Sequence, residues 1–159
     1  MQKIVINASP LIFLAKLEKL SFLDDYEIFV PHAVREELFV DVRPEQDLIR
    51  NFFDQKKIHL VEPQQQKFFP AFLGTGEKAV ITLALEKKIA LVFLDDHRAR
   101  MIARSLKLET RGTLGILLEQ VTKKKITPDE AKALLQKLTK AGFRISEELL
   151  LKVWKELSV

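Results

Sequence analysis

Short apolar runs alternate with longer segments of helical periodicity along most of the chain, and this alternation limits the fold more than any other feature. Parallel strands need long crossover connections, usually helices, so such an alternation indicates a parallel sheet with helices on both faces. We therefore predict an α/β fold, a three-layer α/β/α arrangement with a central parallel sheet of four to five strands and additional C-terminal helices. The expected strands are residues 3–6, 27–31, 58–62, 89–94 and 108–113.

Capping residues and glycine mark the ends of the expected helices. Thr75 is the expected cap of the helix "TGEKAVITLALEKK", which follows a loop in residues 63–76. Thr127 and Glu130 have the spacing of a capping box, and Gly142 is a stop signal near the end of the chain. The three closing helices are expected in residues 114–125, 127–142 and 146–157.

Composition and length limit the number of domains, the kinds of functional site and the partners that the chain can have. With 159 residues, we expect one domain over residues 1–159, in which residues 113–159 form a closing helical segment. The absence of cysteine excludes disulfides, thiolate zinc sites and cysteine nucleophiles. A net charge of +4 permits an anionic partner such as nucleic acid. No apolar run is long enough for a membrane span and no signal peptide is recognisable, so we expect a cytoplasmic protein without membrane contact.

Polar side chains follow two of the expected strands at the edge of the sheet where ligands bind. Asn7 follows the first strand, and Asp95 and Asp96 follow the run "IALVFL". In open parallel sheets, ligands bind at the carboxyl ends of the strands. Carboxylates at the end of a buried strand are costly unless they are paired or bind a metal ion. Capping of the next helix is the competing explanation for all three residues.

Five motifs, in this order and spacing, resemble the PIN-domain family, in a branch related to VapC-like toxins. They are "VINASPLIFLAKL", "VPHAVREEL", "GTGEKAVITLALEKK", "LVFLDDHRAR" and "TRGTLGILL". The resemblance implies a Mg²⁺- or Mn²⁺-dependent ribonuclease. It also implies that Asn7, Glu37, Glu77 and Asp95 are metal ligands, with Asp96 as an additional ligand, and that Glu37, Glu77 and Asp95 are catalytic. Glu77 also suits a helix dipole and Glu37 a solvent-exposed surface, so no single position decides the assignment.

Asn7 is the departure from the family pattern, because most PIN nucleases have aspartate there. An amide supplies one neutral oxygen where a carboxylate supplies charge, so the metal site is expected to be weaker. The alternative hypothesis is a degenerate PIN domain that binds RNA or a partner protein without cleavage. A Rossmann-like nucleotide-binding domain is a third interpretation, but the glycine-rich turn after the first strand is missing.

The expected partners are RNA, a small antitoxin protein and a second copy of the chain in a homodimer, the last two implied by the resemblance. We interpret Arg98, Arg100 and Arg111 as substrate-binding cations near the Asp95 strand, with a solvated helix face as the alternative. Ser9 is either a substrate or ligand contact beside the first acid or a turn hydroxyl. Three phenylalanines before "LGTGE" either stack unpaired bases or anchor the core: Phe68, Phe69 and Phe72. His32 and His59 have no acidic or histidine partner at ligand spacing in the sequence and are expected to be structural.

Overall fold

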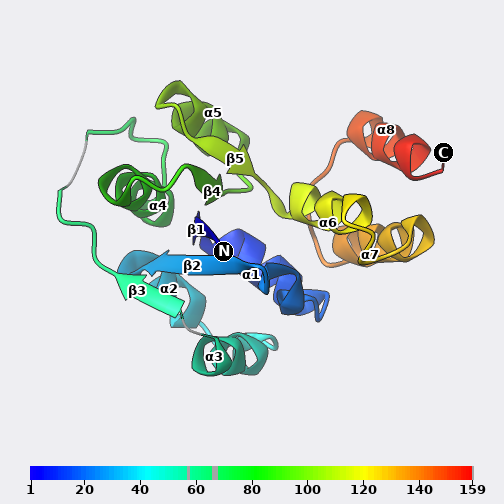
Figure 1. Cartoon of the computed structure of the whole chain (residues 1–159), viewed down its shortest axis with the longest axis horizontal. Coiled ribbons are helices and arrows are strands. Elements are labelled where there is room, and N and C mark those ends of the chain that lie inside the picture. Colours follow the sequence, from blue (N-terminus) through cyan, green and yellow to red (C-terminus); the bar gives the residue numbers. More distant parts are fainter. Residues whose placement is uncertain (57, 66–67, 159) are drawn as a thin grey trace.

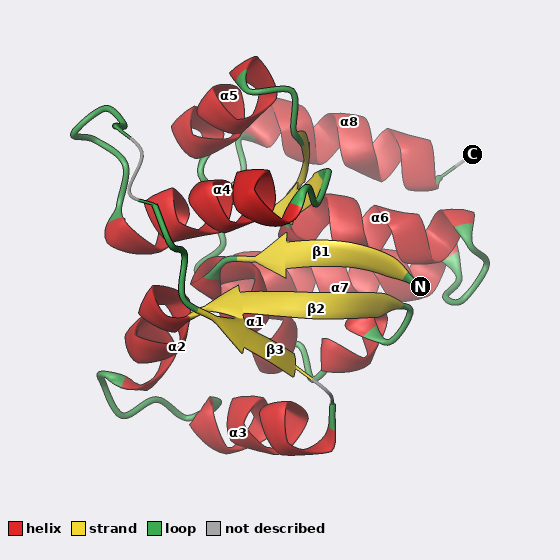
Figure 2. Cartoon of the chain, turned by 60° about the vertical axis from the view of Figure 1, so that its left-hand side comes forward, coloured by secondary structure: helices red, strands yellow, loops and turns green. Residues whose placement is uncertain are grey.

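A five-stranded, all-parallel sheet forms the centre of the computed structural model, which describes residues 1–56, 58–65 and 68–158. The strand order is β3-β2-β1-β4-β5. This arrangement confirms the predicted three-layer α/β/α fold class (Figures 1 and 2). The strands are β1 (Gln2–Ile6), β2 (Tyr26–Pro31), β3 (Ile58–Val61), β4 (Leu91–Phe93) and β5 (Glu109–Arg111).

Helices cover both faces of the sheet. Helix α4 packs against β1, β2 and β4, and in Figure 2 the helices α1, α6 and α7 lie behind the strands. The closing helices α6, α7 and α8 group together at one end of the molecule (Figure 1). The helices are α1 (Ala8–Lys16), α2 (His32–Phe39), α3 (Gln46–Gln55), α4 (Thr75–Lys87), α5 (His97–Ser105), α6 (Thr113–Thr122), α7 (Pro128–Lys140) and α8 (Glu147–Leu157), with a short 3₁₀ helix at Leu20–Leu23.

The two central strands are buried on both faces and form the middle of the core. All residues of β4 and the last three of β1 are fully buried, which explains why these strands are continuous apolar runs without alternation. Ile6 pairs with Phe93 in the parallel register, and the Asn7 N–H donates to the Phe93 carbonyl at 3.0 Å. The register therefore brings the residues after β1 and β4 to the same edge of the sheet.

Local details of the expected helices and strands hold in part. The capping box at Thr127 is present, since its hydroxyl accepts from the Glu130 N–H at 3.1 Å and Glu130 accepts from the Thr127 N–H at 2.8 Å. Thr75 does not cap α4, because Gly74 holds the cap position and Thr75 is already helical. The 3₁₀ helix had no counterpart among the expected elements. None of the described helices is long and apolar enough to cross a membrane.

His59 has contacts in the sheet that its neighbours in the sequence do not reveal. Its Nε2 lies 3.0 Å from Glu27 Oε1, and its ring stacks on Phe29 with centroids 4.5 Å apart. His59 therefore does have an acidic partner. The sequence hid this contact because β2 and β3 are separated by two helices, and only their pairing in the sheet brings the two residues together.

Candidate functional site

Asn7 ends β1 at the carboxyl edge of the sheet and holds the cap position of α1. Its backbone has extended cap geometry, with φ −87° and ψ 170°, but its side chain makes no capping hydrogen bond. The residue is 9% exposed, and its Oδ1 atom is buried without a hydrogen-bond partner. A buried polar atom without a partner is costly and uncommon in folded proteins. Capping therefore does not account for the side chain of Asn7, and its oxygen is available to a ligand.

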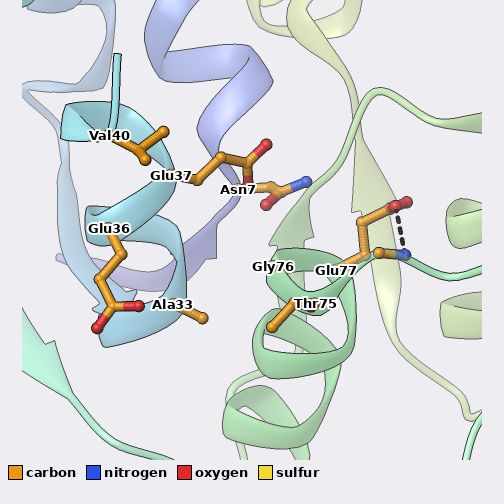
Figure 3. A pocket seen from close by; sticks show the side chains of 9 residues that line it. Asn7, Ala33, Glu36, Glu37, Val40, Thr75, Gly76 and Glu77 are labelled. Carbon is orange, nitrogen blue, oxygen red and sulfur yellow. Dashed lines mark hydrogen bonds between the residues drawn. The ribbon is translucent and has the colours of Figure 1, made fainter.

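Glu37 reaches the same position from α2. Figure 3 shows the Glu37 and Asn7 side chains close to one another, whereas the neighbouring Glu36 points away. A Cβ atom placed on Gly76 would lie 2.8 Å from Glu37 Oε2 and 3.0 Å from Asn7 Oδ1. Both oxygens thus crowd around the one residue of α4 that has no side chain. The glycine at position 76, in the "GTGE" motif, therefore allows the two oxygens to come this close to α4.

Glu77 lies in the first turn of α4, and its two carboxylate oxygens differ. Oε1 accepts a hydrogen bond from the Gly74 N–H at 3.0 Å, whereas Oε2 is buried without a partner. Burial raises the pKa of Glu77, and the negative charges of Asp96 and Glu37 raise it further, against the Gly74 N–H and the positive charge of Arg98. Two negative charges therefore act on Glu77, and a cation bound beside it would offset them.

Three of the four predicted ligands line one cavity of about 430 Å³ between α2 and the start of α4. Asn7 comes from the edge of the sheet, Glu37 from α2 and Glu77 from α4, and the carboxylate of Glu77 is turned toward the Gly74 N–H (Figure 3). Ala33, Glu36, Val40 and residues 74–76 complete the wall. The strand order and the helix packing therefore bring together side chains that are 70 residues apart in the sequence.

Asp95, the fourth predicted ligand, follows β4 but faces the start of α6. Its Oδ2 accepts hydrogen bonds from Ser9 Oγ at 2.6 Å and Thr113 Oγ1 at 2.7 Å, and its Oδ1 accepts from the Thr113 N–H at 2.6 Å. It lines a separate cavity with residues of α6 and α8, and does not line the cavity that holds Asn7. Three donors fix the orientation of this carboxylate.

Ser9 and Thr113 thus act on Asp95. The hydroxyl of Ser9 holds the predicted ligand, which is one of the roles expected for it, and its contact with a substrate stays a prediction. Thr113 is fully buried and was not singled out in the sequence, although it lies in the motif "TRGTLGILL". A hydroxyl residue at a helix start has a structural use in any fold, so only its distance to Asp95 identifies its role.

Asp96 caps α5, since its side chain accepts from the Ala99 N–H at 2.9 Å. The capping explanation therefore holds for Asp96. Its charge still acts on Glu77, whose pKa it raises. The role of Asp96 as an additional metal ligand stays a prediction.

The three arginines predicted to bind substrate have different surroundings. Arg98 is exposed near Glu77, and its guanidinium lies 4.4 Å from the centroid of the Phe72 ring. Arg100 donates to the carbonyl of Asp95, which ties it to the backbone after β4. Arg111 forms an ion pair with Glu119 and donates to the Tyr26 hydroxyl at 2.8 Å. Only Arg98 combines exposure with closeness to the acidic cavity.

The residues at the acidic cavity fit a hard divalent cation by their chemistry. Mg²⁺ and Mn²⁺ prefer carboxylate and carbonyl oxygens, and Asn7 Oδ1 and Glu77 Oε2 are such oxygens without a hydrogen donor. A carboxylate has about four lone-pair positions, so the hydrogen bonds to Asp95 leave room for a further contact. Among the described residues, however, no three Asp, Glu or His side chains converge closely enough to hold an ion by themselves. A metal site at this cavity would therefore have to combine the amide oxygen of Asn7 with the carboxylates of Glu37 and Glu77.

Comparison with known proteins gives one match and one negative result. A family model described as "DUF3368: PIN domain" matches residues 3–158, which is nearly the whole chain. The match includes Asn7, Glu37, Glu77 and Asp95. No curated protein matches the chain.

Proposed function

The chain belongs to the PIN-domain family, and from this premise we propose that it is a Mg²⁺- or Mn²⁺-dependent endoribonuclease. The family has a nuclease-type fold, whereas the reaction and its site in this chain are our proposal. Asn7, Glu37 and Glu77 would hold the ion in the acidic cavity, with Asp95 beside them at the same edge of the sheet.

The pair of buried oxygens without hydrogen-bond partners is the observation that carries this proposal. Asn7 and Glu77, which carry these two oxygens, line the same cavity, and Glu37 adds a negative charge there. A carboxylate with a raised pKa near other acids is stabilised either by protonation or by a bound cation. Such arrangements of perturbed carboxylates in a cavity are typical of functional sites.

Each residue of the site has its own task in phosphodiester hydrolysis. When bound, a divalent cation would supply water activation and would offset negative charge on the phosphate. Asn7, Glu37 and Glu77 would bind and orient it, and the Gly74 N–H fixes one oxygen of Glu77 for this purpose. Ser9 and Thr113 hold Asp95 in one orientation. Arg98, exposed beside Glu77, would attract the phosphate backbone of the RNA.

A second candidate function is RNA or protein binding without cleavage. Two observations favour it: Asn7 provides no charge, and the carboxylate of Asp95 is occupied by three hydrogen bonds from the protein. In this interpretation the acidic cavity would be a remnant of a metal site. The two candidates differ in whether RNA is cut.

Cleavage of a labelled single-stranded RNA in Mn²⁺, Mg²⁺ and EDTA tests the proposal. We expect cleavage in Mn²⁺, none in EDTA, and a loss of at least 100-fold in Glu77→Gln and Asp95→Asn, as is usual when a group that positions reactants is removed. Glu36→Gln is the matched control, because Glu36 lines the same cavity but points away from Asn7. Absence of metal-dependent cleavage by the wild type, with RNA binding retained, would establish the second candidate.

The resemblance to VapC-like toxins also supports a biological role as the toxin of a toxin–antitoxin pair, acting in the cytoplasm as a homodimer. Induced expression in a bacterial host should then arrest growth for the wild type and not for Glu77→Gln. Growth arrest by both proteins at equal abundance would contradict a toxicity based on this site. Sedimentation of the purified chain would show whether it is a dimer.

A further inference from the structure

A second cavity, of about 470 Å³, opens beside the acidic cavity. The two cavities share Ala33 and Thr75 as lining residues. In Figure 3 these two side chains lie between α2 and α4, next to the group formed by Asn7 and Glu37. A ligand held in the acidic cavity could therefore extend past Ala33 and Thr75 into the second cavity without leaving the protein surface.

The lining of the second cavity combines flat apolar surface with hydrogen-bonding groups. Phe68 and Phe69 supply two phenyl rings, and Gln65 supplies an amide. Thr75 and Thr82 add hydroxyls. Aromatic rings with a few well-placed polar groups are suited to a nucleobase, which has two flat faces and a polar edge. Glu62 and Lys78 also line this cavity with opposite charges, so the lining has no net charge that would favour a phosphate over a base.

Phe68 is the residue that most needs an explanation. Its side chain is 101% exposed, whereas Phe69 packs against the core. Phe72, from the same loop, has one face covered by Arg98 at 4.4 Å. Among the described contacts, no ring or cation lies against Phe68. A fully exposed phenyl ring at the mouth of a cavity offers both faces for stacking.

We propose that the second cavity binds one unpaired nucleobase of the RNA, next to the phosphate at the metal site that Asn7, Glu37 and Glu77 would form, and that Phe68 stacks on this base. The inference rests on the proposed function and deepens it, because it assigns one base of the RNA to a defined subsite. Bases inside a duplex are paired and stacked on each other, so their faces cannot reach a phenyl ring on the protein. Only a single strand can place a base in one cavity and its phosphate in the adjacent one.

The test measures binding and cleavage separately. Binding of a fluorescently labelled single-stranded octaribonucleotide is followed by anisotropy in Ca²⁺ and in EDTA, with a second series in which one abasic residue is moved along the strand. We expect the abasic residue to weaken binding about 10-fold at one position in the wild type, the effect of one lost stacked base. Phe68→Ala should weaken binding of the intact strand by a similar factor and should show no further loss at that position.

Leu151→Ala is the matched control, because Leu151 is a 60% exposed apolar residue on α8, outside both cavities. It should bind both series like the wild type. If Phe68→Ala binds like the wild type, or loses the same factor on every strand regardless of the abasic position, the base subsite is overturned. The second result would indicate a general apolar surface, such as a contact for a partner protein.

The outcomes also separate this inference from the proposed function. In one outcome, Phe68→Ala removes the effect of the abasic residue at one position while the wild type shows no cleavage in Mn²⁺. This pair of results would support the base subsite in a protein that binds RNA but does not cut it. Cleavage by a wild type whose affinity does not depend on the position of the abasic residue would support the nuclease and overturn the base subsite. Equal affinity for single-stranded and duplex RNA would overturn the subsite as well, and no binding of RNA at all would overturn both proposals.

Discussion

Gly76→Ala separates the geometry of the acidic cavity from the stability of the fold. The added methyl group would lie 2.8 Å from Glu37 Oε2 and 3.0 Å from Asn7 Oδ1. Ordinary contact begins near 3.4 Å, so Glu37 Oε2 must retreat by about 0.6 Å and Asn7 Oδ1 by about 0.4 Å. Glu37 is exposed and can move easily, whereas Asn7 is buried at the end of β1 and has little freedom.

We therefore expect Gly76→Ala to impair metal binding and cleavage more than the stability of the fold. Replacing glycine by alanine inside a helix stabilises by roughly 0.5–1 kcal/mol, and this gain offsets the strain at Asn7. We expect the free energy of unfolding to change by less than about 1 kcal/mol, equivalent to about 2–4 °C in Tm for a chain of this size. Displacement of reacting groups by a fraction of an ångström to 1 Å can lower rates by up to about 100-fold. We expect Mn²⁺ affinity and RNA cleavage to fall at least 10-fold.

Isothermal titration with Mn²⁺, thermal unfolding and RNA cleavage measure the three quantities on the same sample. Gly142→Ala is the matched control, because Gly142 has φ +96° and no atom near its added Cβ. This variant should lower stability by about 1 kcal/mol through backbone strain and should keep the metal affinity and activity of the wild type. Wild-type Mn²⁺ affinity and cleavage in Gly76→Ala would refute the assignment of Asn7 and Glu37 to a common site.

Three further predictions concern single side chains. Thr113→Val removes one hydroxyl donor from Asp95 but keeps the backbone N–H contact. The free energy of unfolding in urea titrations should fall by about 1–2 kcal/mol, and Mn²⁺ affinity should fall about 10-fold. No change in either quantity would show that the hydroxyl does not orient Asp95. Asn7→Asp adds charge to the cavity and should tighten Mg²⁺ binding, measured by titration; equal affinity in both proteins would count against Asn7 as a ligand. Burial raises the pKa of Tyr26 to about 12, with a further contribution from its hydrogen bond to Glu119. The folded pKa lies above the unfolded value of 10.0, so this stabilisation is complete below about pH 10 and is lost as the pH rises toward 12; the stability of the wild type should fall relative to Tyr26→Phe over this window, and parallel curves would disprove the linkage.

The sequence predicted the fold class and the edge of the sheet where the site lies, because both follow from local patterns. Strands buried on both faces are continuous apolar runs, and the polar residue that ends each run is visible without any tertiary information. Asn7 and Asp95 could be placed in this way. The extent of each element was less certain: the run "IALVFL" yields only the three residues Leu91–Phe93 as strand.

Contacts between distant segments could not be derived from the sequence. Glu27 and His59 meet through the pairing of β2 and β3, and Thr113 meets Asp95 through the packing of α6. Arg98 and Arg111 were equivalent candidates for substrate binding, but the fold turns Arg111 toward Glu119 and leaves Arg98 exposed near Glu77. These differences depend on side-chain directions in three dimensions, which periodicity does not encode.

The sequence by itself determined which oxygen-bearing side chains lie at the ends of the strands and the starts of the helices. Only the tertiary structure decided their partners. Asn7 and Glu77 each keep a buried oxygen without a hydrogen donor, whereas Asp95 receives three donors. The physical reason is that a hydrogen bond requires a donor within about 3 Å in the right direction, and the packing of α2, α4 and α6 on the sheet sets where those donors lie.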